Sequence, residues 1–363
     1  SSFTSSFVNT TAQVLKQGEV QGSDVAAHLA GVLDIKTTIL PDADALFLTA
    51  IDRYGHELWR WTFPVNKLNQ ANEVLSPLSN KVTSTETENE LTVKAKNHTF
   101  IFSKKDGQLK GVSVNNRKIS FANGPRFIGA RRADRSLDQF YNHDDEKAKE
   151  KDRTYSEFPD AAVFTKLDVK EDGGNLIVTA DYKLGNLDKV QWTINPNGEA
   201  VLDYTYNFSG VVDLMGICFD YPEDQVISKR WLGAGPYRVW QNRIHGTQYD
   251  VWENDYNDPI PGETFTYPEF KGYFGSVSWM NIRTKEGTIS LTNETPDAYI
   301  GVYQPRDGRD RLLYTLPESG ISVLNVIPPV RNKVNSTDLC GPSSQPKWVN
   351  GPQSGRIIFR FME

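Results

Sequence analysis

Apolar and polar residues alternate in short runs along most of this chain, and turn residues separate the runs. Leu91, Val93 and Ala95 alternate with polar neighbours, and the Asp106-Gly107 pair that follows is a strong hairpin signal. A period of two places alternate side chains on opposite faces of a β-strand, so one face can be buried. The pattern therefore predicts a meander of strands from residue 91 onward.

Strands of the same kind are expected along the rest of the chain, and no helical stretch longer than about three turns follows from the pattern. They are predicted at 109–114, 162–169, 175–184, 189–194, 199–208, 275–283, 288–293, 298–303, 321–327 and 356–361. So many strands in one unit favour an all-β sandwich of two extended sheets.

The first 75 residues form a separate small unit in this interpretation. Strands are predicted at Val32–Ile39, Ala45–Arg53 and Leu58–Val65, with short turns between them. The polar stretch at 66–90 is typical of a linker, with a boundary near residue 80. The sequence is therefore divided into domains at 1–75 and 76–363.

Composition agrees with a sheet protein and narrows the class of partner. Aromatic residues make up 11% of the chain, with 27 Gly and 19 Pro, which favours strands and turns. The net charge is −6 and no basic stripe is present, which argues against nucleic acid. No apolar run is long enough to cross a membrane. The chain opens SSFTSSF without an initiator Met or an apolar leader, as expected of an excised piece.

Motifs of metal-dependent, nucleophilic and phosphate-binding enzymes are missing from the sequence, so no catalytic residue and no metal ligand are predicted. The carboxylates Glu253, Asp255, Asp258, Glu263 and Glu269 include no pair marked for glycoside hydrolysis. Two points stay open. A calcium ion among Asp134, Asp144 and Asp145 is one, although their spacing matches no calcium loop. A disulfide between Cys218 and Cys340 is the other, because two cysteines imply no framework.

Aromatic residues gather between Arg230 and Asp258, next to several glycines and a proline. Aromatic rings stack on the apolar faces of sugars, and polar side chains bind the hydroxyl groups. Trp231 and Trp279 lie on apolar strand patterns and are expected in the core, whereas Trp240 and Trp252 flank polar residues and are expected at the surface. The predicted substrate-binding residues are Trp240, Asn242, Arg243, Tyr249, Trp252 and Glu253.

The same segment carries a family resemblance. Trp231-Leu232-Gly233-Ala234-Gly235-Pro236, followed by Trp240, Asn242 and Arg243, resembles a motif in the last domain of β-galactosidase-type enzymes of glycoside hydrolase family 2. Residues 90–119 resemble the opening of that domain, and the stretch from Gly341 resembles its last loop and closing strand. The resemblance covers about residues 85–363.

The resemblance implies a galactose-mutarotase-like β-supersandwich, preceded by the tail of an immunoglobulin-like domain that lacks a strand or two upstream. The family's catalytic glutamates lie on a (β/α)₈ barrel, which has no counterpart in this chain. The chain alone would then be non-catalytic, and no cofactor is expected. It would bind carbohydrate and close one side of the active-site pocket on a barrel of the same polypeptide. A secreted bacterial parent enzyme would place it in the periplasm or outside the cell.

Departures from the family pattern leave the sugar open, and two other functions remain. Residues 130–135 differ from the family's R-A-P-x-D-N-D, Arg238 replaces an acidic residue, and Trp348 is displaced from the late loop at 340–345. One alternative is a stand-alone aldose epimerase, whose general acid and base would be His245 with Glu253 or Glu269. The other is a purely structural sandwich, with all its aromatic residues in the core.

Overall fold

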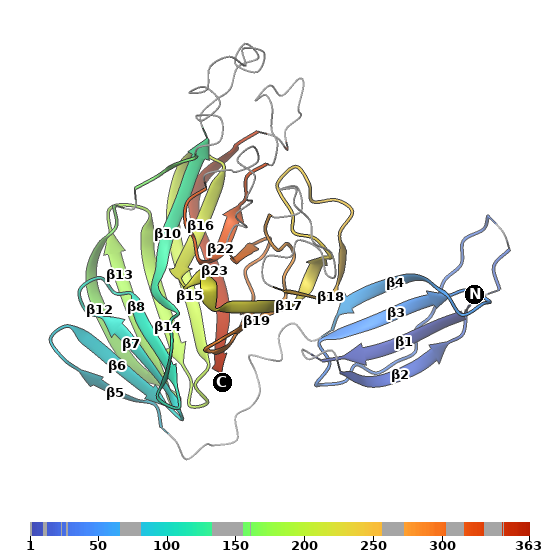
Figure 1. Cartoon of the computed structure of the whole chain (residues 1–363), viewed down its shortest axis with the longest axis horizontal. Coiled ribbons are helices and arrows are strands. Elements are labelled where there is room, and N and C mark those ends of the chain that lie inside the picture. Colours follow the sequence, from blue (N-terminus) through green and yellow to red (C-terminus); the bar gives the residue numbers. More distant parts are fainter. Residues whose placement is uncertain are drawn as a thin grey trace, which may run out of the picture. The chain divides into compact units, whose positions relative to one another are not determined.

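The computed structural model contains two compact units (Figure 1). One comprises residues 1–77 and 249–251, and the other comprises residues 78–248 and 252–363. It describes residues 2–9, 13–22, 24–26, 28–65, 81–132, 155–159, 161–255, 272–302, 316–329, 343 and 345–363. In these described ranges no helix is long and apolar enough to span a bilayer.

The first unit contains one antiparallel sheet in the order β2-β1-β3-β4. Its strands are β1 (Ser2–Val8), β2 (Val14–Val20), β3 (Ala45–Ile51) and β4 (Glu57–Pro64). The predictions at Ala45–Arg53 and Leu58–Val65 correspond to β3 and β4. The strand predicted at Val32–Ile39 is wrong, because this stretch pairs with no described strand. The immunoglobulin-like assignment stays a prediction, since it requires two sheets and the described residues of this unit form one.

The second unit is a sandwich of two large sheets, with ten and nine strands among the described residues. The ten-stranded sheet contains β5 (Thr83–Glu86), β6 (Glu90–Ala95), β7 (His98–Ser103), β8 (Leu109–Val114), β9 (Arg117–Ile119), β10 (Ala122–Arg132), β11 (Tyr155–Glu157), β16 (Leu214–Asp220), β21 (Tyr299–Val302) and β22 (Ile321–Val326). The nine-stranded sheet contains β12 (Val163–Asp172), β13 (Asn175–Lys183), β14 (Leu187–Ile194), β15 (Ala200–Val212), β17 (Val226–Gly235), β18 (Gln248–Asp255), β19 (Trp279–Thr284), β20 (Gly287–Asn293) and β23 (Lys347–Met362). The predicted all-β sandwich is therefore confirmed.

The core lies between these two sheets, where the alternating residues meet. Leu91 and Val93 of β6 are completely buried, as the period-two pattern requires. Phe219 of β16 packs on rings of the opposite sheet, with its centroid 6.1 Å from that of Trp192 on β14 and 5.6 Å from that of Phe359 on β23. Phe121, next to β10, stacks on Phe219 at 4.5 Å. The aromatic residues of the sequence thus supply much of the contact between the sheets.

The longest pairing joins β15 to β23, from Ala200 opposite Phe359 to Val212 opposite Lys347. The C-terminal strand therefore lies inside the nine-stranded sheet, between β15 and β20. Both strands extend beyond the predicted stretches 199–208 and 356–361. The added part of β23 contains Gly351, which has a positive φ of 93°, together with Pro352 and Gly355. Local patterns assign these residues to turns, whereas here they lie within the long ladder to β15.

One carboxylate connects the two sheets at a turn. Glu286, between β19 and β20, accepts hydrogen bonds from the Ser120 backbone N–H (2.8 Å), the Ser120 hydroxyl (2.7 Å) and the Tyr221 hydroxyl (3.0 Å). Burial raises the pKa of Tyr221, so its hydroxyl keeps its proton and donates. Because Ser120 lies between β9 and β10 of the ten-stranded sheet, this cluster links that sheet to the nine-stranded one.

We predict that Glu286→Ala lowers the free energy of unfolding by about 2–3 kcal/mol, because it leaves three donors of a partly buried cluster without their acceptor. Glu286→Gln should cost less, since an amide oxygen retains part of the hydrogen bonding. Urea unfolding followed by fluorescence measures both changes.

Lys285→Ala is the matched control, because Lys285 occupies the same turn and is exposed. Its effect should stay within about 0.5 kcal/mol. Equal losses in Glu286→Ala and Lys285→Ala would show that the carboxylate does not link the sheets.

Candidate functional site

The aromatic segment predicted from the sequence begins in β17 of the nine-stranded sheet. It then turns over residues 236–247 and returns to the sheet as β18. Two glycines at the end of β17 let neighbours approach closely. A Cβ on Gly233 would lie 3.0 Å from the Gly275 carbonyl oxygen, and one on Gly235 would lie 2.4 Å from Cδ1 of Trp252. The G-x-G part of the motif therefore has a packing role, because it makes room for Trp252 and for the chain at 275.

The Phe274 ring is surrounded by an aromatic side chain and two cations, a group that the sequence did not indicate. Trp231 contacts Phe274 edge-on, with centroids 4.8 Å apart, and its indole N–H donates to the Ala234 carbonyl at 3.0 Å. Lys229 and Arg238, both almost completely buried, lie 6.0 and 5.8 Å from the centroid of the Phe274 ring. Buried cations are held in place by such contacts. The available signal was weak, because Lys229 lies between Ser228 and Arg230 in the sequence of β17.

Trp240 corrects the prediction of a surface ring, because its side chain is only 2% exposed. Reciprocal backbone hydrogen bonds between Val239 and Tyr273, of 2.7 and 2.8 Å, hold this part of the turn against residues 272–274. The indole packs edge-on against Tyr273, with centroids 5.6 Å apart, in a cluster that also contains Ile128 and Leu324 of the ten-stranded sheet. Trp240 therefore anchors the turn and presents no open face for stacking.

Gln241 binds two described residues of the stretch 340–345, which the resemblance matches to the family's late loop. Its side-chain N–H groups donate to the carbonyls of Ser343 (2.9 Å) and Gln345 (2.7 Å), and its backbone N–H donates to that of Pro328 (3.0 Å). The Gln241 side chain is 7% exposed, so these bonds are shielded from water. Trp348 follows on β23, opposite Val211, and is 72% exposed.

Asn242 and Arg243 complete the turn, in which the Arg243 backbone N–H donates to the Trp240 carbonyl at 2.8 Å. Asn242 is half-buried and Arg243 exposed. On β18, Trp252 is half-buried and its indole N–H donates to the Gln248 carbonyl at 3.2 Å, while Glu253 is exposed.

The structure thus joins Trp240, Asn242 and Arg243 in one turn and leaves Trp252 beside Gly235. Tyr249 is half-buried, and its range, 249–251, groups with the first unit. The core predictions for Trp231 and Trp279 are confirmed, at 0% and 3% exposure. The substrate-binding role of the six predicted residues stays a prediction.

The epimerase alternative gains no contact from the described residues. His245 is exposed in the turn and its backbone carbonyl accepts the Tyr237 hydroxyl at 3.0 Å; Glu253 is exposed on β18. Glu269 lies outside the described residues, as do Asp258, Glu263 and the possible calcium ligands Asp134, Asp144 and Asp145. Among the residues that are described, no group of three or more His, Cys, Asp or Glu side chains could hold a metal ion.

Cys218 carries a free thiol on β16. It is 3% exposed, and burial raises its pKa to about 11, so the thiol stays protonated at neutral pH. The Arg126 guanidinium donates to its sulfur at 3.7 Å and to Asp220 at 2.7 Å. A neutral, buried thiol is a poor nucleophile, and this one serves packing. Cys340 lies outside the described residues.

We predict that Gly235→Ala destabilises the protein by about 1–3 kcal/mol, because the new methyl group has to displace the Trp252 ring. The displacement would also break the hydrogen bond from the Trp252 indole to Gln248. Urea unfolding gives the change in stability, and near-ultraviolet circular dichroism reports the environment of the ring.

Gly111→Ala is the matched control, since Gly111 lies in β8 and a Cβ there meets nothing within 4 Å. Its effect should stay within about 0.5 kcal/mol. An unchanged near-ultraviolet spectrum and stability in Gly235→Ala would contradict the packing role of the motif.

Comparison with solved structures finds distant likenesses to this protein. The galactose 1-epimerase from Lactobacillus acidophilus NCFM is similar over 78% of this chain and 99% of its own, with a TM-score of 0.44 and 10% identity. The GalM/aldose epimerase homologue from C. elegans is similar over 77% of this chain and 99% of its own, with a TM-score of 0.38 and 8% identity. Likenesses this distant do not bear on activity. No curated protein matches the sequence.

A match at the level of a family is clear. The model of the beta galactosidase small chain family matches residues 94–327, which is more than half of the chain and runs from β6 to the end of β22. The matched range includes the glycine motif, the turn at 240–243, and the buried residues Lys229 and Arg238 beside Phe274. This chain therefore belongs to the beta galactosidase small chain family.

Proposed function

We propose that this chain is the C-terminal, pocket-closing region of a β-galactosidase-like enzyme of glycoside hydrolase family 2. In this role it binds carbohydrate and associates with a larger catalytic section that carries the two catalytic glutamates. The observation that carries the proposal is the tie from Gln241 to Ser343 and Gln345, within a chain of the beta galactosidase small chain family.

These hydrogen bonds matter because they hold the residue that directly precedes Asn242 and Arg243. Trp240 is buried and Gln241 is bound to Ser343 and Gln345, so Asn242 and Arg243 follow two anchored residues. Arg243 is exposed and carries N–H donors that suit sugar hydroxyl groups. A site of this kind gains affinity from polar groups that do not have to be ordered on binding.

The proposal assigns no hydrolytic step to this chain. Glycoside hydrolysis requires two carboxyl groups on either side of the scissile bond. Within residues 230–248 and 252–255, the carboxylates are Glu253 and Asp255, which are both exposed on β18. No contact among the described residues joins either of them to the turn at 240–243. Aldose epimerisation is the alternative, and it needs a general acid and base facing each other.

We expect the isolated chain to release no nitrophenol from nitrophenyl β-galactoside, and to restore hydrolysis when it is added to a family 2 catalytic section that lacks this region. Arg243→Ala should raise KM by about tenfold or more in the restored enzyme, because a charged donor to the sugar is lost. Steady-state kinetics on the mixture measures the change.

Arg283→Ala provides a control in which an exposed arginine is lost from β19, outside the turn. Its KM should stay within about twofold of the wild type. Hydrolysis by the isolated chain would refute the non-catalytic role. Mutarotation by the isolated chain that is lost in His245→Ala would favour the epimerase.

A further inference from the structure

Two buried N–H groups of the nine-stranded sheet have no hydrogen-bond acceptor among the described residues. They are the indole N–H of Trp279, on β19, and the Nε–H of Arg230, on β17. Trp279 is 3% exposed, and Arg230 is half-buried. Buried N–H groups are nearly always hydrogen-bonded in folded proteins, because a group left without an acceptor costs free energy. These two therefore need an acceptor that the described residues do not supply.

The two side chains are neighbours on the outer face of the sheet. Met280 and Ile282 of β19 point into the core between the two sheets, so Trp279 and Asn281 point to the other side. Arg230 lies opposite Asn281, which makes it a diagonal neighbour of Trp279. Diagonal neighbours are about 7–8 Å apart, within reach of long and aromatic side chains. One small group can therefore meet both N–H groups.

The chemistry of the two side chains selects an anion. Both are hydrogen-bond donors, and neither can accept. The Arg230 guanidinium also carries a full charge, and a charge that is withdrawn from water needs a counter-charge. Glu253 and Asp255 lie on the neighbouring strand β18 but are exposed, and neither forms an ion pair with Arg230. The missing partner is therefore a negatively charged acceptor.

Arg360 shows how the same face accommodates another arginine. It lies in the same row as Arg230, because Ser290 is paired with Arg360 on one side and with Asn281 on the other. Its guanidinium is 2.6 Å from the carboxylate of Glu199. Among the described residues Arg230 has no such carboxylate. An oxoanion from solution would do for Arg230 what Glu199 does for Arg360.

The ligand has to be small, because the chain itself already covers Trp279. Exposure rises along β19 from buried Trp279 through half-buried Asn281 to exposed Arg283. Arg283 has an acceptor of its own, since its Nε–H donates to the Ser228 hydroxyl at 3.0 Å. A small group can enter from the side of Arg283, whereas the surface of another domain cannot reach the indole.

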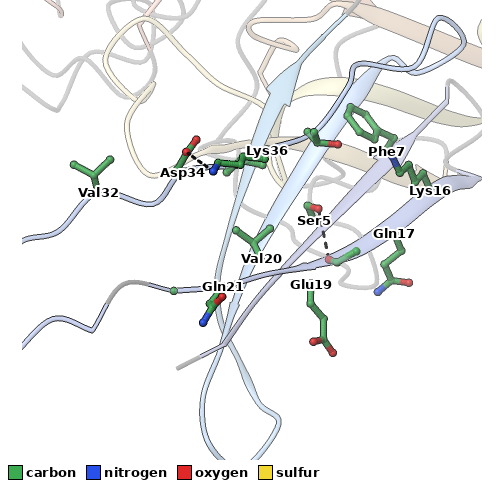
Figure 2. Close-up of a pocket in the computed structure, with 14 residues that line it drawn as sticks. Ser5, Phe7, Lys16, Gln17, Glu19, Val20, Gln21, Val32, Asp34 and Lys36 are labelled. Carbon is green, nitrogen blue, oxygen red and sulfur yellow. Dashed lines mark hydrogen bonds and ion pairs between the residues drawn. The ribbon is translucent and has the colours of Figure 1, made fainter.

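The groove of the first unit offers no comparable signal. It has a volume of about 540 Å³ and lies over β1 and β2 (Figure 2). Its charged residues, Lys16, Glu19, Asp34 and Lys36, are exposed and of both signs. None of the residues that line it has a buried side-chain atom without a partner. Its chemistry therefore selects no ligand, in contrast to the two donors on β17 and β19.

We propose that Arg230 and Trp279 bind a small oxoanion group, that is, a carboxylate, sulfate or phosphate, on the outer face of the nine-stranded sheet. The oxygen atoms of the anion accept hydrogen bonds from the Nε–H of Arg230 and from the indole N–H of Trp279. The amide of Asn281 can donate a third bond. Hydrogen bonds from arginine to an anion are short and strong. This proposal does not rest on the sugar-binding role of the turn at 240–243.

The test is an NMR titration that follows the indole N–H resonances of the 8 tryptophans. Trp279→Phe identifies the resonance of Trp279. Sodium phosphate, sodium sulfate and sodium galacturonate are each added up to about 50 mM, a range that covers millimolar affinities. A background of about 0.15 M NaCl screens weak, long-range attraction. The Trp279 resonance should shift and saturate, and that of exposed Trp348 should not move.

Arg230→Gln should weaken binding by about tenfold or more, because the charge and the Nε–H are both lost. Arg283→Ala is the matched control, since it removes an arginine from the same face that already has its own acceptor. Its affinity should stay within about threefold of the wild type, because its charge acts only through screened solvent.

The outcomes separate the sources of the anion. Similar affinities for the three anions support a site for the oxoanion alone, and a clear preference for galacturonate over phosphate and sulfate supports an acidic sugar. A Trp279 resonance that none of the three moves would overturn the proposal. So would an equal shift with neutral galactose, or an affinity that Arg230→Gln leaves unchanged.

A second measurement needs no variant. Calorimetric titration of the wild type with the same anions should give one site per chain, with the affinity that the Trp279 resonance reports. Absence of saturable heat for every anion would contradict the proposal, whether or not the variants fold.

Discussion

Edge-on packing of Phe219 against Trp192 and Phe359 joins the two large sheets at the centre of the second unit. These rings come from strands far apart in the sequence and meet where both inner faces are apolar. Because the space between the sheets is filled by side chains, ligands have access only to the outer faces and the connecting loops. The turn at 236–247 is one of these places.

The same constraint explains why the glycine motif has a structural role first. β17 ends where Trp252 and the chain at Gly275 approach it, and a side chain at Gly233 or Gly235 would collide with them. The turn that follows then buries Trp240 and exposes Arg243. The two glycines therefore set the shape of the turn, and this shape leaves Arg243 at the surface.

The two units differ in how completely they bury their aromatic residues. In the second unit, Trp192 and Trp231 are covered from both sides, whereas Trp59 and Trp61 of the first unit lie on a sheet with one open face. The difference follows from the number of layers. Two sheets cover each other's inner faces in the second unit, whereas the described residues of the first unit form a single sheet.

Period-two alternation and turn residues were enough to predict the fold class, most strands of the second unit and the place of the candidate segment, because these signals act locally. The sequence also separated Trp231 and Trp279 as core residues. It was wrong about Trp240 and about Val32–Ile39. Both depend on tertiary contacts, since the burial of a ring depends on which distant segment packs on it, here residues 272–274, and a strand forms only where a partner is in register. The tie from Gln241 to Ser343 and Gln345 likewise joins residues about a hundred positions apart, a contact that no local pattern contains.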